Sequence, residues 1–581
     1  MDLSSIIPAY WLSAGILVAA LIMFVSEKIR HDLVALLALL AAVATGLVAP
    51  KDALNGFGDP AVVAVASVLV VGRALELSGV AGRLARVALP KNGGFSLQLA
   101  VLMLMGAFLS AFMNNIAALV IVMPLGAEIA RLHKRPQGAV LMPLAFATIL
   151  GGMTTLIGTP ANMILSSVRE DRLGEPFAFF AMTPVGVAVS VAGLAYLALV
   201  GWRLLPRRTS AEDGQMPWRI FELQLIEAVT LARSEVARQL RETSTRLLGF
   251  VRRGRHLPWP QDDRLKRRDR LVLLTRARPE DVAAAVAFPV ASPAPEPSDI
   301  TAHMVIGNNS LLVGQRYEAI SLRSNGEVSL TGVGPRKGGD LVPMESLIFR
   351  TGDQLFLTGS PEAISTFAAR ERLLEVDRSD PAPMDGRKAA MTVGIFLIAI
   401  GAAVFFDAQP ALAFLAAGVA MAALRLIPGR ETYRSIDWSI IVLLAAMIPV
   451  GQSFETSGAA GIVAQAAGNV LAGTPLIVCL AAVCAMTLVL TIMLNNVATA
   501  LIMGPLAIQL AGLLNVSPDA VLLAVLIGTS SDFLTPIGHQ NNLLVMGPGG
   551  YKFSDYSRAG ALLSLIVVAT SATVLSLIYG G

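Results

Sequence analysis

Long apolar runs without a single charge constrain this chain more than any other feature. They span residues 11–25, 33–49, 61–72, 389–406, 438–450 and 559–579. Several approach the roughly 20 residues that a helix needs to cross a bilayer. Only 15% of the 581 residues are charged, whereas soluble proteins average about 25%. The sequence therefore predicts a polytopic α-helical membrane protein.

The apolar pattern stops near Leu205, and the stretch from Pro206 to about Asp385 is polar, charged and rich in proline. Within this stretch, the segment 264–281 resembles the segment 346–363. Each has a turn, an apolar strand and then Pro-Glu opening a helix. We therefore expect an inserted α+β domain made of two subdomains. The expected organisation is a membrane half at 1–208, subdomains at 209–290 and 291–385, and a second membrane half at 386–581.

The membrane part also repeats itself, in three blocks that keep nearly one offset. The offsets are 379, 381 and 380 for segments 57–82 over 436–461, 110–125 over 491–506, and 157–165 over 537–545. Chance similarity between apolar runs would not preserve order and spacing in this way. The sequence therefore predicts an internal duplication.

The Lys and Arg residues orient the expected spans, because cytoplasmic loops carry an excess of them. With Lys28 and Arg30 inside, the stretch 95–132 is too short for two spans and returns to the same side. It is predicted to be a re-entrant hairpin, and its counterpart at about 470–512 enters from the opposite side. Each half then has five spans plus one hairpin, and an odd number of spans inverts the second copy. By the same count the inserted domain is cytoplasmic.

Two repeat-related asparagine pairs, Asn114-Asn115 and Asn495-Asn496, lie at the expected hairpin turns. A broken helix at membrane depth survives only where protein or a water-filled cavity satisfies its backbone. Carbonyls freed there can coordinate a cation, and helix N-termini can face an anion. Asn supplies both oxygen ligands and NH donors. The alternative is that these residues only join helices by hydrogen bonds.

Matching loops in the two halves, residues 158–162 (GTPAN) and 538–542 (GHQNN), interrupt later apolar runs. Gly and Pro break a helix and free its carbonyls. Such interruptions at corresponding positions of two halves indicate a transporter's binding site, although a simple kink is the alternative.

At these motifs the chain resembles the divalent anion/sodium symporter family. The hairpins, the GTPAN loop and the segment 535–556 carry the resemblance. The inserted repeats resemble the C-terminal domains of potassium-uptake regulators (TrkA-C or RCK C-terminal domains), a combination similar to the sulfate-type members of the family.

The resemblance implies two sodium ions at the hairpin tips and broken loops, with the anion between the tips. The implied cation-binding residues are Asn114, Asn115, Gly158, Asn495, Asn496 and Gly538. The implied anion-binding residues are Asn114, Asn115, Thr159, Pro160, Asn162, Asn495, Asn496, His539 and Asn542.

The chain departs from the family pattern at the hairpin motif, which reads Ser-Asn-Thr in dicarboxylate transporters. Here it reads Asn-Asn-Ile at 114–116 and Asn-Asn-Val at 495–497, so both hydroxyls that would contact the anion are replaced. This favours a small inorganic oxyanion such as sulfate over a dicarboxylate. His539 stands where Thr is usual, and Asp532 lies near the same break. Both are candidates for proton or ion coupling, although each has a structural alternative.

The sequence thus predicts a secondary active transporter in the inner (plasma) membrane that couples sodium to uptake of a divalent anion by an elevator-type movement. The alternative is a cation/proton antiporter of the same superfamily, for which Asp532 and His539 are the favouring features. No HExxH zinc pair, nucleophile elbow or phosphate loop indicates an enzyme. We expect a homodimer with no cofactor other than sodium as the coupling ion and no nucleic-acid partner. The basic run Arg264–Arg270 makes a small anionic regulator of the insert a further expectation.

Overall fold

The computed structural model divides the chain into two compact units. The helical unit combines Met1–Thr209 with Asp380–Gly581, and the insert is Ser210–Ser379. The structure describes residues 8–26, 29–90, 93–205, 219–240, 245–252, 255–257, 259–260, 262–275, 279–291, 300–307, 310–334, 347–375, 386–406, 408–536 and 538–580. The helical unit is therefore assembled from both ends of the chain, whereas the insert is continuous in sequence.

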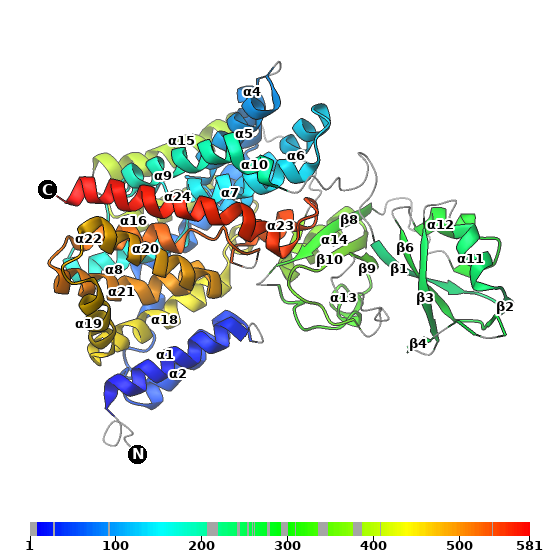
Figure 1. Ribbon diagram of the computed structural model, residues 1–581, viewed down its shortest axis with the longest axis horizontal. Coiled ribbons are helices and arrows are strands. Elements are labelled where there is room, and N and C mark those ends of the chain that lie inside the picture. Colours follow the sequence, from blue (N-terminus) through cyan, green and yellow to red (C-terminus); the bar gives the residue numbers. More distant parts are fainter. Residues whose placement is uncertain are drawn as a thin grey trace. The chain divides into compact units, whose positions relative to one another are not determined.

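The two halves of the helical unit run through the same order of long, short and interrupted helices. Figure 1 shows helices of both halves, coloured blue to cyan and yellow to red, in this one unit. The first half contains α1 (Ala9–Ser26), α2 (His31–Ala44), η2 (Asn55–Gly58), α3 (Pro60–Leu77), α4 (Val80–Ala88), α5 (Phe95–Ser110), α6 (Asn115–Leu132), η3 (Gln137–Ala139), α7 (Leu141–Gly152), α8 (Pro160–Leu173), α9 (Thr183–Tyr196), η4 (Leu197–Gly201) and α10 (Trp202–Leu204). The second half contains α15 (Gly386–Phe405), α16 (Pro410–Ala423), α17 (Gly429–Arg434), α18 (Trp438–Thr456), α19 (Ala459–Leu471), α20 (Leu476–Met493), α21 (Asn496–Leu514), α22 (Pro518–Thr529), α23 (Gln540–Met546) and α24 (Phe553–Tyr579).

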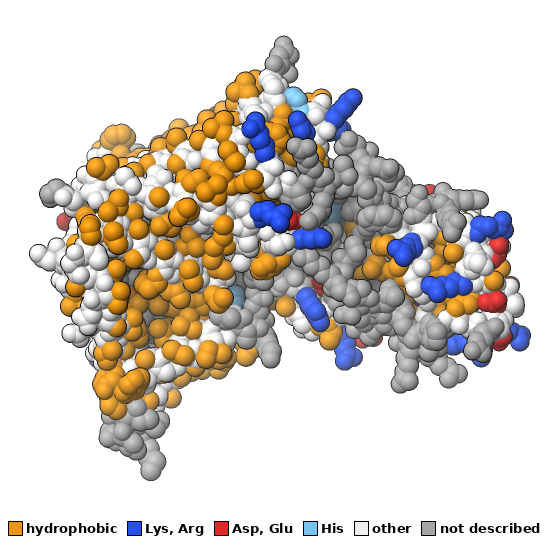
Figure 2. Space-filling model, in the orientation of Figure 1, with side chains coloured by type: hydrophobic (Ala, Val, Ile, Leu, Met, Phe, Trp, Pro, Cys, Tyr) orange, Lys and Arg blue, Asp and Glu red, His pale blue; other side chains and the backbone are white. Residues whose placement is uncertain are grey.

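Eight helical segments in the described part of the chain are long and apolar enough to cross a membrane. They are α3, α6, Thr183–Leu204, α15, α18, α20, α21 and α24. Large apolar side chains also stay exposed on the surface, among them Ile398 at 72% and Leu577 at 80%. Figure 2 shows apolar side chains spread over this unit, with few charges among them. An exposed apolar surface of this extent suits contact with lipid, so the prediction of a multi-pass helical membrane protein is confirmed at that level.

The helices of this unit fall into two groups, which we name outer helices (α1–α4 and α15–α19) and core helices (α5–α10 and α20–α24). Among the outer helices, α3 packs on α16 and its repeat counterpart α18 packs on α2. Among the core helices, α5 packs on α7, α20 on α22, and α24 runs beside α9. Every residue of α7 is buried, as is α22 from Ala520 onward. These two helices are therefore the centre of the unit.

A reciprocal exchange of side-chain size sets the spacing between the paired core helices. In the first half, a Cβ on Gly106 of α5 would lie 3.4 Å from Cγ2 of Thr148 on α7. In the second half the sizes are reversed, and a Cβ on Gly528 of α22 would lie 2.7 Å from Cβ of Thr487 on α20. Each pair thus places one small and one β-branched residue at the contact, which keeps the helices close. The exchange also leaves the hydroxyl of Thr148 on α7, where it faces the loops described below.

The insert contains one sheet whose central path runs β11-β8-β10-β9-β1-β6-β3-β4, with β7 pairing beside β1. Strands β2 and β5 form a separate pair. The strands are β1 (Arg219–Leu225), β2 (Val229–Thr230), β3 (Arg246–Arg252), β4 (Arg255–Leu257), β5 (Arg264–Leu265), β6 (Arg270–Thr275), β7 (Val290–Ala291), β8 (Ile300–Ile306), β9 (Val328–Val333), β10 (Gln354–Gly359) and β11 (Leu373–Glu375). The helices are α11 (Arg233–Leu240), α12 (Pro279–Ala285), α13 (Glu318–Arg323) and α14 (Pro361–Glu371).

Two separate apolar clusters fill the insert, one from residues 221–288 and one from residues 302–373. The turn before β6 and the turn before β10 are built alike. Asp269 accepts a hydrogen bond from the Lys266 backbone N–H at 2.7 Å, and Asp353 accepts one from the Arg350 N–H at 2.7 Å. Asp269 also pairs with Arg252 at 2.7 Å, and this hydrogen bond raises the pKa of Arg252.

Candidate functional site

The tips of two helix hairpins begin the candidate site. The first hairpin is α5–α6 and the second is α20–α21. Asn114 caps α6, its Oδ1 accepting from the Ile116 N–H at 2.9 Å, and Asn495 caps α21, its Oδ1 accepting from the Ala498 N–H at 2.8 Å. Because each cap oxygen is used by its own helix, the part of the side chain that remains for a ligand is the NH₂ group, a donor. The Asn495 NH₂ lies 3.3 Å from Nδ1 of His31 on α2.

The second asparagine of each pair is the first residue of its helix and has a hydroxyl behind it. Ser110 Oγ donates to Asn115 Oδ1 at 2.6 Å. Thr491 Oγ1 lies 3.4 Å from Asn496 Oδ1 while it donates to the Thr529 carbonyl oxygen at 2.9 Å. The two hydroxyl residues are separated by the same 381 positions as the asparagines. Sequence reasoning missed them, although a hydroxyl at equivalent positions of both copies was the available signal.

The first loop, residues 153–159, joins α7 to α8 and is satisfied by its own polar groups. Asn162 Nδ2 donates to the carbonyl oxygens of Gly152 at 2.9 Å and Thr155 at 2.8 Å. Thr159 Oγ1 donates to Asn162 Oδ1 at 3.2 Å. A Cβ on Gly158 would lie only 2.3 Å from the Gly152 carbonyl oxygen, so only glycine fits there. Asn162 therefore braces this loop with both ends of its amide.

The second loop, residues 530–539, joins α22 to α23 and repeats half of that arrangement. Asn542 Nδ2 donates to the carbonyl oxygens of Asp532 at 2.7 Å and Thr535 at 3.1 Å. A Cβ on Gly538 would lie 2.9 Å from Oδ1 of Asp532. The bracing asparagine and the tight glycine are thus present in both loops, at the 380-residue offset.

His539 fastens the second loop to the first hairpin. The Asn541 backbone N–H donates to His539 Nδ1 at 3.1 Å, so a neutral ring carries its proton on Nε2. Nε2 lies 3.2 Å from the Asn115 amide, which must present its oxygen to that proton; a 180° amide rotation achieves this and lets the amide nitrogen donate to Ser110. Asn541 Nδ2 donates to the Asn115 carbonyl at 3.1 Å and to Thr148 Oγ1 at 2.8 Å.

Four helices begin at these hairpin tips and loops: α6 at Asn115, α8 at Pro160, α21 at Asn496 and α23 at Gln540. The first residues of a helix carry unpaired N–H groups and a partial positive charge. No Lys or Arg occurs in 111–115, 153–162, 494–496 or 530–542. Any anion bound here would therefore depend on N–H and amide donors.

Asp532 is the acidic side chain of the site and is 1% exposed. Neither of its carboxylate oxygens makes a well-formed hydrogen bond to a described residue, although the side chains of Asn496 and Thr491 lie next to it. Other buried oxygens without a partner also lie in the second half, on Thr499, Ser530, Asn541 and Asn542. Since buried polar groups are normally satisfied, these oxygens are the ones in this half that remain available to a partner. Among the described residues no group of three or more His, Cys, Asp or Glu side chains could hold a metal ion.

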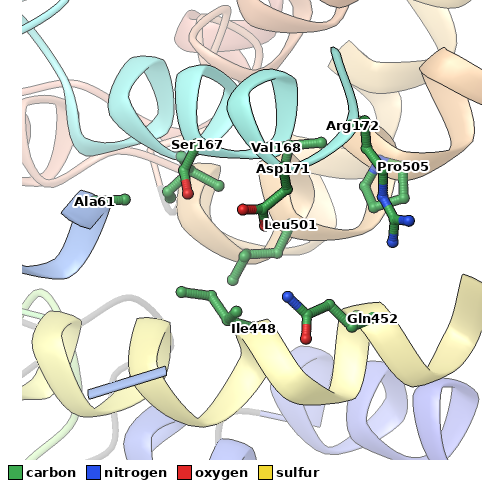
Figure 3. A pocket seen from close by; sticks show the side chains of 11 residues that line it. Ala61, Ser167, Val168, Asp171, Arg172, Ile448, Gln452, Leu501 and Pro505 are labelled. Carbon is green, nitrogen blue, oxygen red and sulfur yellow. The ribbon is translucent and has the colours of Figure 1, made fainter. Parts of the chain in front are cut away.

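A small, partly open cavity lies between core and outer helices, lined by residues of α3, α8, α18 and α21. Figure 3 shows Asp171 of α8 and Gln452 of α18 pointing into the space between their helices. Beside it, Arg172 pairs with Glu455 of α18 at 2.5 Å. Ser167 donates to Asp59 at 3.2 Å. These contacts join core helix α8 to the outer helices and were not predicted from the sequence.

A helical membrane unit with two interrupted, asparagine-lined sites of this kind defines a membrane transporter. The family model described as citrate transporter matches residues 21–528 and 479–580. The chain belongs to this citrate transporter family, within the divalent anion/sodium symporter superfamily. The prediction of a transporter from this superfamily is confirmed at that level.

Three relatives are similar to the chain over different lengths. It is 32% identical to an uncharacterized transporter of Synechocystis sp., over 98% of this chain and 97% of the relative. It is 26% identical to the uncharacterized transporter YfbS of Escherichia coli, over 97% of this chain and 98% of that protein. It is also 26% identical to sodium/sulfate cotransporter 2 of Chlamydomonas reinhardtii, over 39% of this chain and 26% of that protein.

Proposed function

We propose that this protein is a secondary active transporter that couples sodium to the uptake of a small divalent oxyanion such as sulfate. The observation that carries the proposal is the pair of repeat-related sites, each made of a hairpin tip and a broken loop. In secondary transporters, such interrupted helices bind substrate and coupling ions near the midplane. The inverted relation of the two halves would bring the two tips together from opposite faces.

The anion is held by donors from the two caps. The NH₂ groups of Asn114 and Asn495 would donate to it, together with the positive ends of α6 and α21, and the Asn495 NH₂ would exchange its contact with His31 for the anion. Both family hydroxyls are absent from the motif, and a compact tetrahedral anion needs fewer contacts than a dicarboxylate. The name of the Chlamydomonas relative, a sodium/sulfate cotransporter, supports this choice. The family's printed name makes citrate the competitor to test first.

The cations are held by oxygens behind the tips. In the first half these come from Asn115 and the carbonyls near Gly158, and in the second half from Asn496 and the carbonyls near Gly538. Backbone carbonyls of unwound helices and side-chain oxygens are the ligands that sodium takes in transporters. Asn115 is bonded to Ser110 and His539 in this structure, so cation binding in the first half must share or displace one of these contacts.

Transport proceeds by movement of the core helices against the outer helices, in an elevator-type cycle of a homodimer. Few polar side-chain contacts cross between the two groups near the site, and they include Arg172–Glu455, Ser167–Asp59 and Asn495–His31. These weak contacts would break and re-form as the core moves. The insert, with its two TrkA-C-like subdomains, is a cytoplasmic regulatory module of this inner-membrane protein and binds a small anionic regulator.

The test is uptake of labelled sulfate into proteoliposomes, with an inward gradient of sodium or of choline. We expect sodium-dependent accumulation that is competed weakly by citrate and succinate. N495A should lower uptake because it removes both a helix cap and an anion donor, whereas S329A, in the insert, should not. Equal uptake with sodium and choline would show that transport is not coupled to sodium. Stronger competition by citrate than by unlabelled sulfate would show that citrate, not sulfate, is the preferred substrate.

A cation/proton antiporter is the second candidate, and the buried Asp532 favours it, because an antiporter needs one buried group to carry either ion. An outward proton gradient would then drive sodium movement without any anion. D532N should abolish that movement, whereas an anion symporter shows none to abolish.

A further inference from the structure

Basic side chains gather where the α5–α6 hairpin and helix α10 end, away from the hairpin tip. Arg131 lies in the last turn of α6, Lys134 and Arg135 follow that helix, and Arg203 lies on α10. All of them are exposed, and we call them the basic cluster. Figure 2 shows Lys and Arg side chains together with a His at the end of the helical unit where Figure 1 draws α6. Among the described residues no acidic side chain pairs with the cluster, not even the exposed Glu128 one turn before Arg131.

Aromatic rings hold two of the guanidinium groups of this cluster. Arg135 Cζ lies 5.5 Å from the centre of the Trp202 ring and 5.8 Å from the centre of the Phe95 ring. Arg203 Cζ lies 5.3 Å from the centre of the Trp202 ring. The Phe95 and Trp202 rings pack edge to face, with their centroids 4.9 Å apart. A guanidinium held on a ring face keeps the N–H groups of its edge for a further acceptor.

The two rings are themselves fixed by buried contacts. His133 packs its ring edge to face on Phe95 at 5.7 Å, and its Nε2 lies 2.7 Å from Oε1 of Gln98, which is 4% exposed. Trp202 Nε1 donates to the Ala198 carbonyl at 3.0 Å, within the π-helical turn η4. Such turns recur at functional sites, because they shift the helix register by one residue. The arginines are therefore positioned before any partner arrives.

Exposed apolar side chains lie beside the basic ones. Leu132 follows Arg131 and is 65% exposed, and Leu199 and Val200, in the turn before Trp202, are 64% and 44% exposed. A free anion such as phosphate would use only the charges, whereas a phospholipid has a phosphate for the arginines and acyl chains for the apolar side chains. Tryptophan is also typical of the membrane–water interface. The combination therefore fits a lipid better than a soluble anion.

We propose that the basic cluster binds the phosphate headgroup of an anionic phospholipid, with the guanidinium groups of Arg135 and Arg203 as the main donors. The positive-inside count places this end of α6 on the cytoplasmic side, where anionic lipids attract basic segments close to the membrane. A lipid bound here joins the base of the first hairpin to the end of α9–α10, so it stabilises the core helices as one group. The inference is independent of which anion the protein transports.

The experiment measures the thermal unfolding midpoint of the purified full-length protein in dodecyl maltoside, in chloride buffer, during titration with dioleoyl phosphatidylglycerol or dioleoyl phosphatidylcholine. We expect saturable stabilisation by phosphatidylglycerol and a much smaller shift with phosphatidylcholine. In R135Q/R203Q the phosphatidylglycerol concentration for half of the shift should rise at least about tenfold, because two basic residues that attract the headgroup are lost. Glycerol phosphate at the same concentrations should give no comparable shift.

R434Q is the matched control, because Arg434 is an exposed arginine in the last turn of α17, outside the basic cluster; it should keep the wild-type lipid response. If the double variant does not yield folded protein, R135Q and R203Q are measured singly. Native mass spectrometry should show fewer phosphatidylglycerol molecules retained by these variants than by the wild type. Equal shifts with the two lipids in the wild type, a wild-type response in the double variant, or an equal loss in R434Q would overturn the proposal. Equal stabilisation by glycerol phosphate would identify a soluble phosphate site and overturn the lipid assignment.

Discussion

The ion pair between Arg172 of α8 and Glu455 of α18 should restrain the separation of core from outer helices. Their side chains are 32% and 18% exposed and 2.5 Å apart. A partly exposed pair of this kind contributes about 0.5–1 kcal/mol after screening by solvent. Removing it should therefore change the ratio of open to closed cavity by about twofold to fivefold.

The assay is the rate at which a membrane-impermeant thiol reagent modifies S167C, because Ser167 lines the cavity beside this pair. Background labelling should be low, since both native cysteines, Cys479 and Cys484, are buried. In the S167C background, R172Q should speed modification about twofold to fivefold. The charge exchange R172E with E455R should return the rate toward its original value.

The control for this prediction is R169Q, on the same helix. Arg169 pairs with Asp519 of α22, and both α8 and α22 are core helices that would move together. R169Q should leave the modification rate within the scatter of the parent. Equal effects of R169Q and R172Q, or a charge exchange that restores nothing, would show that the pair does not restrain this movement.

Two further substitutions test the packing of each unit. G158A should lower the unfolding midpoint and abolish uptake, at a cost of about 3 kcal/mol, because its Cβ would lie 2.3 Å from the Gly152 carbonyl oxygen. The control G72A should be tolerated, since a Cβ there meets nothing within 4 Å. Equal losses in both variants would contradict the steric explanation. D269A should speed hydrogen–deuterium exchange of residues 246–275 in the full-length protein by removing the buried partner of Arg252, a loss of about 2–3 kcal/mol; unchanged exchange would show that this pair does not stabilise the insert.

The parts of this site that could be predicted from the sequence are the residues that recur in both halves at the same offset. The offset near 380 paired Asn114 with Asn495 and Asn162 with Asn542. In the structure the Asn162 and Asn542 amide nitrogens make equivalent hydrogen bonds. Asn114 and Asn495 each cap their own helix, the first through the second following N–H and the other through the third. Charge-free runs gave the helices, because a bilayer tolerates few other patterns.

The parts that could not be predicted are contacts between the halves and between core and outer helices. Residues 115 and 539 are 424 positions apart, and their contact depends on how two duplicated copies dock. Periodicity and motif spacing carry no information about that docking. The same holds for Arg172 and Glu455, because an isolated charge at a span end is compatible with solvent, lipid headgroups or a partner.

The different roles of the two asparagines in each pair also could not be assigned from the sequence. From the sequence, all four asparagines were candidates for both cation and anion. Helix capping distinguishes the first asparagine of each pair from the second. The side-chain oxygens of Asn114 and Asn495 accept hydrogen bonds from their own helices and are not available to a cation. The amide of Asn115 instead contacts Ser110 and His539, and the amide oxygen of Asn496 faces Thr491.

The central claim, that one anion binds between two asparagine-capped hairpin tips with cations behind them, is tested most directly by an experimental map. The protein would be imaged with saturating sodium and an electron-dense sulfate analogue such as selenate. The account predicts oxyanion density within hydrogen-bond distance of the Asn114 and Asn495 amides, and cation density behind the tips, beside Asn115 and Asn496. Oxyanion density in the cavity lined by Asp171 and Gln452, with none at the hairpin tips, would contradict it.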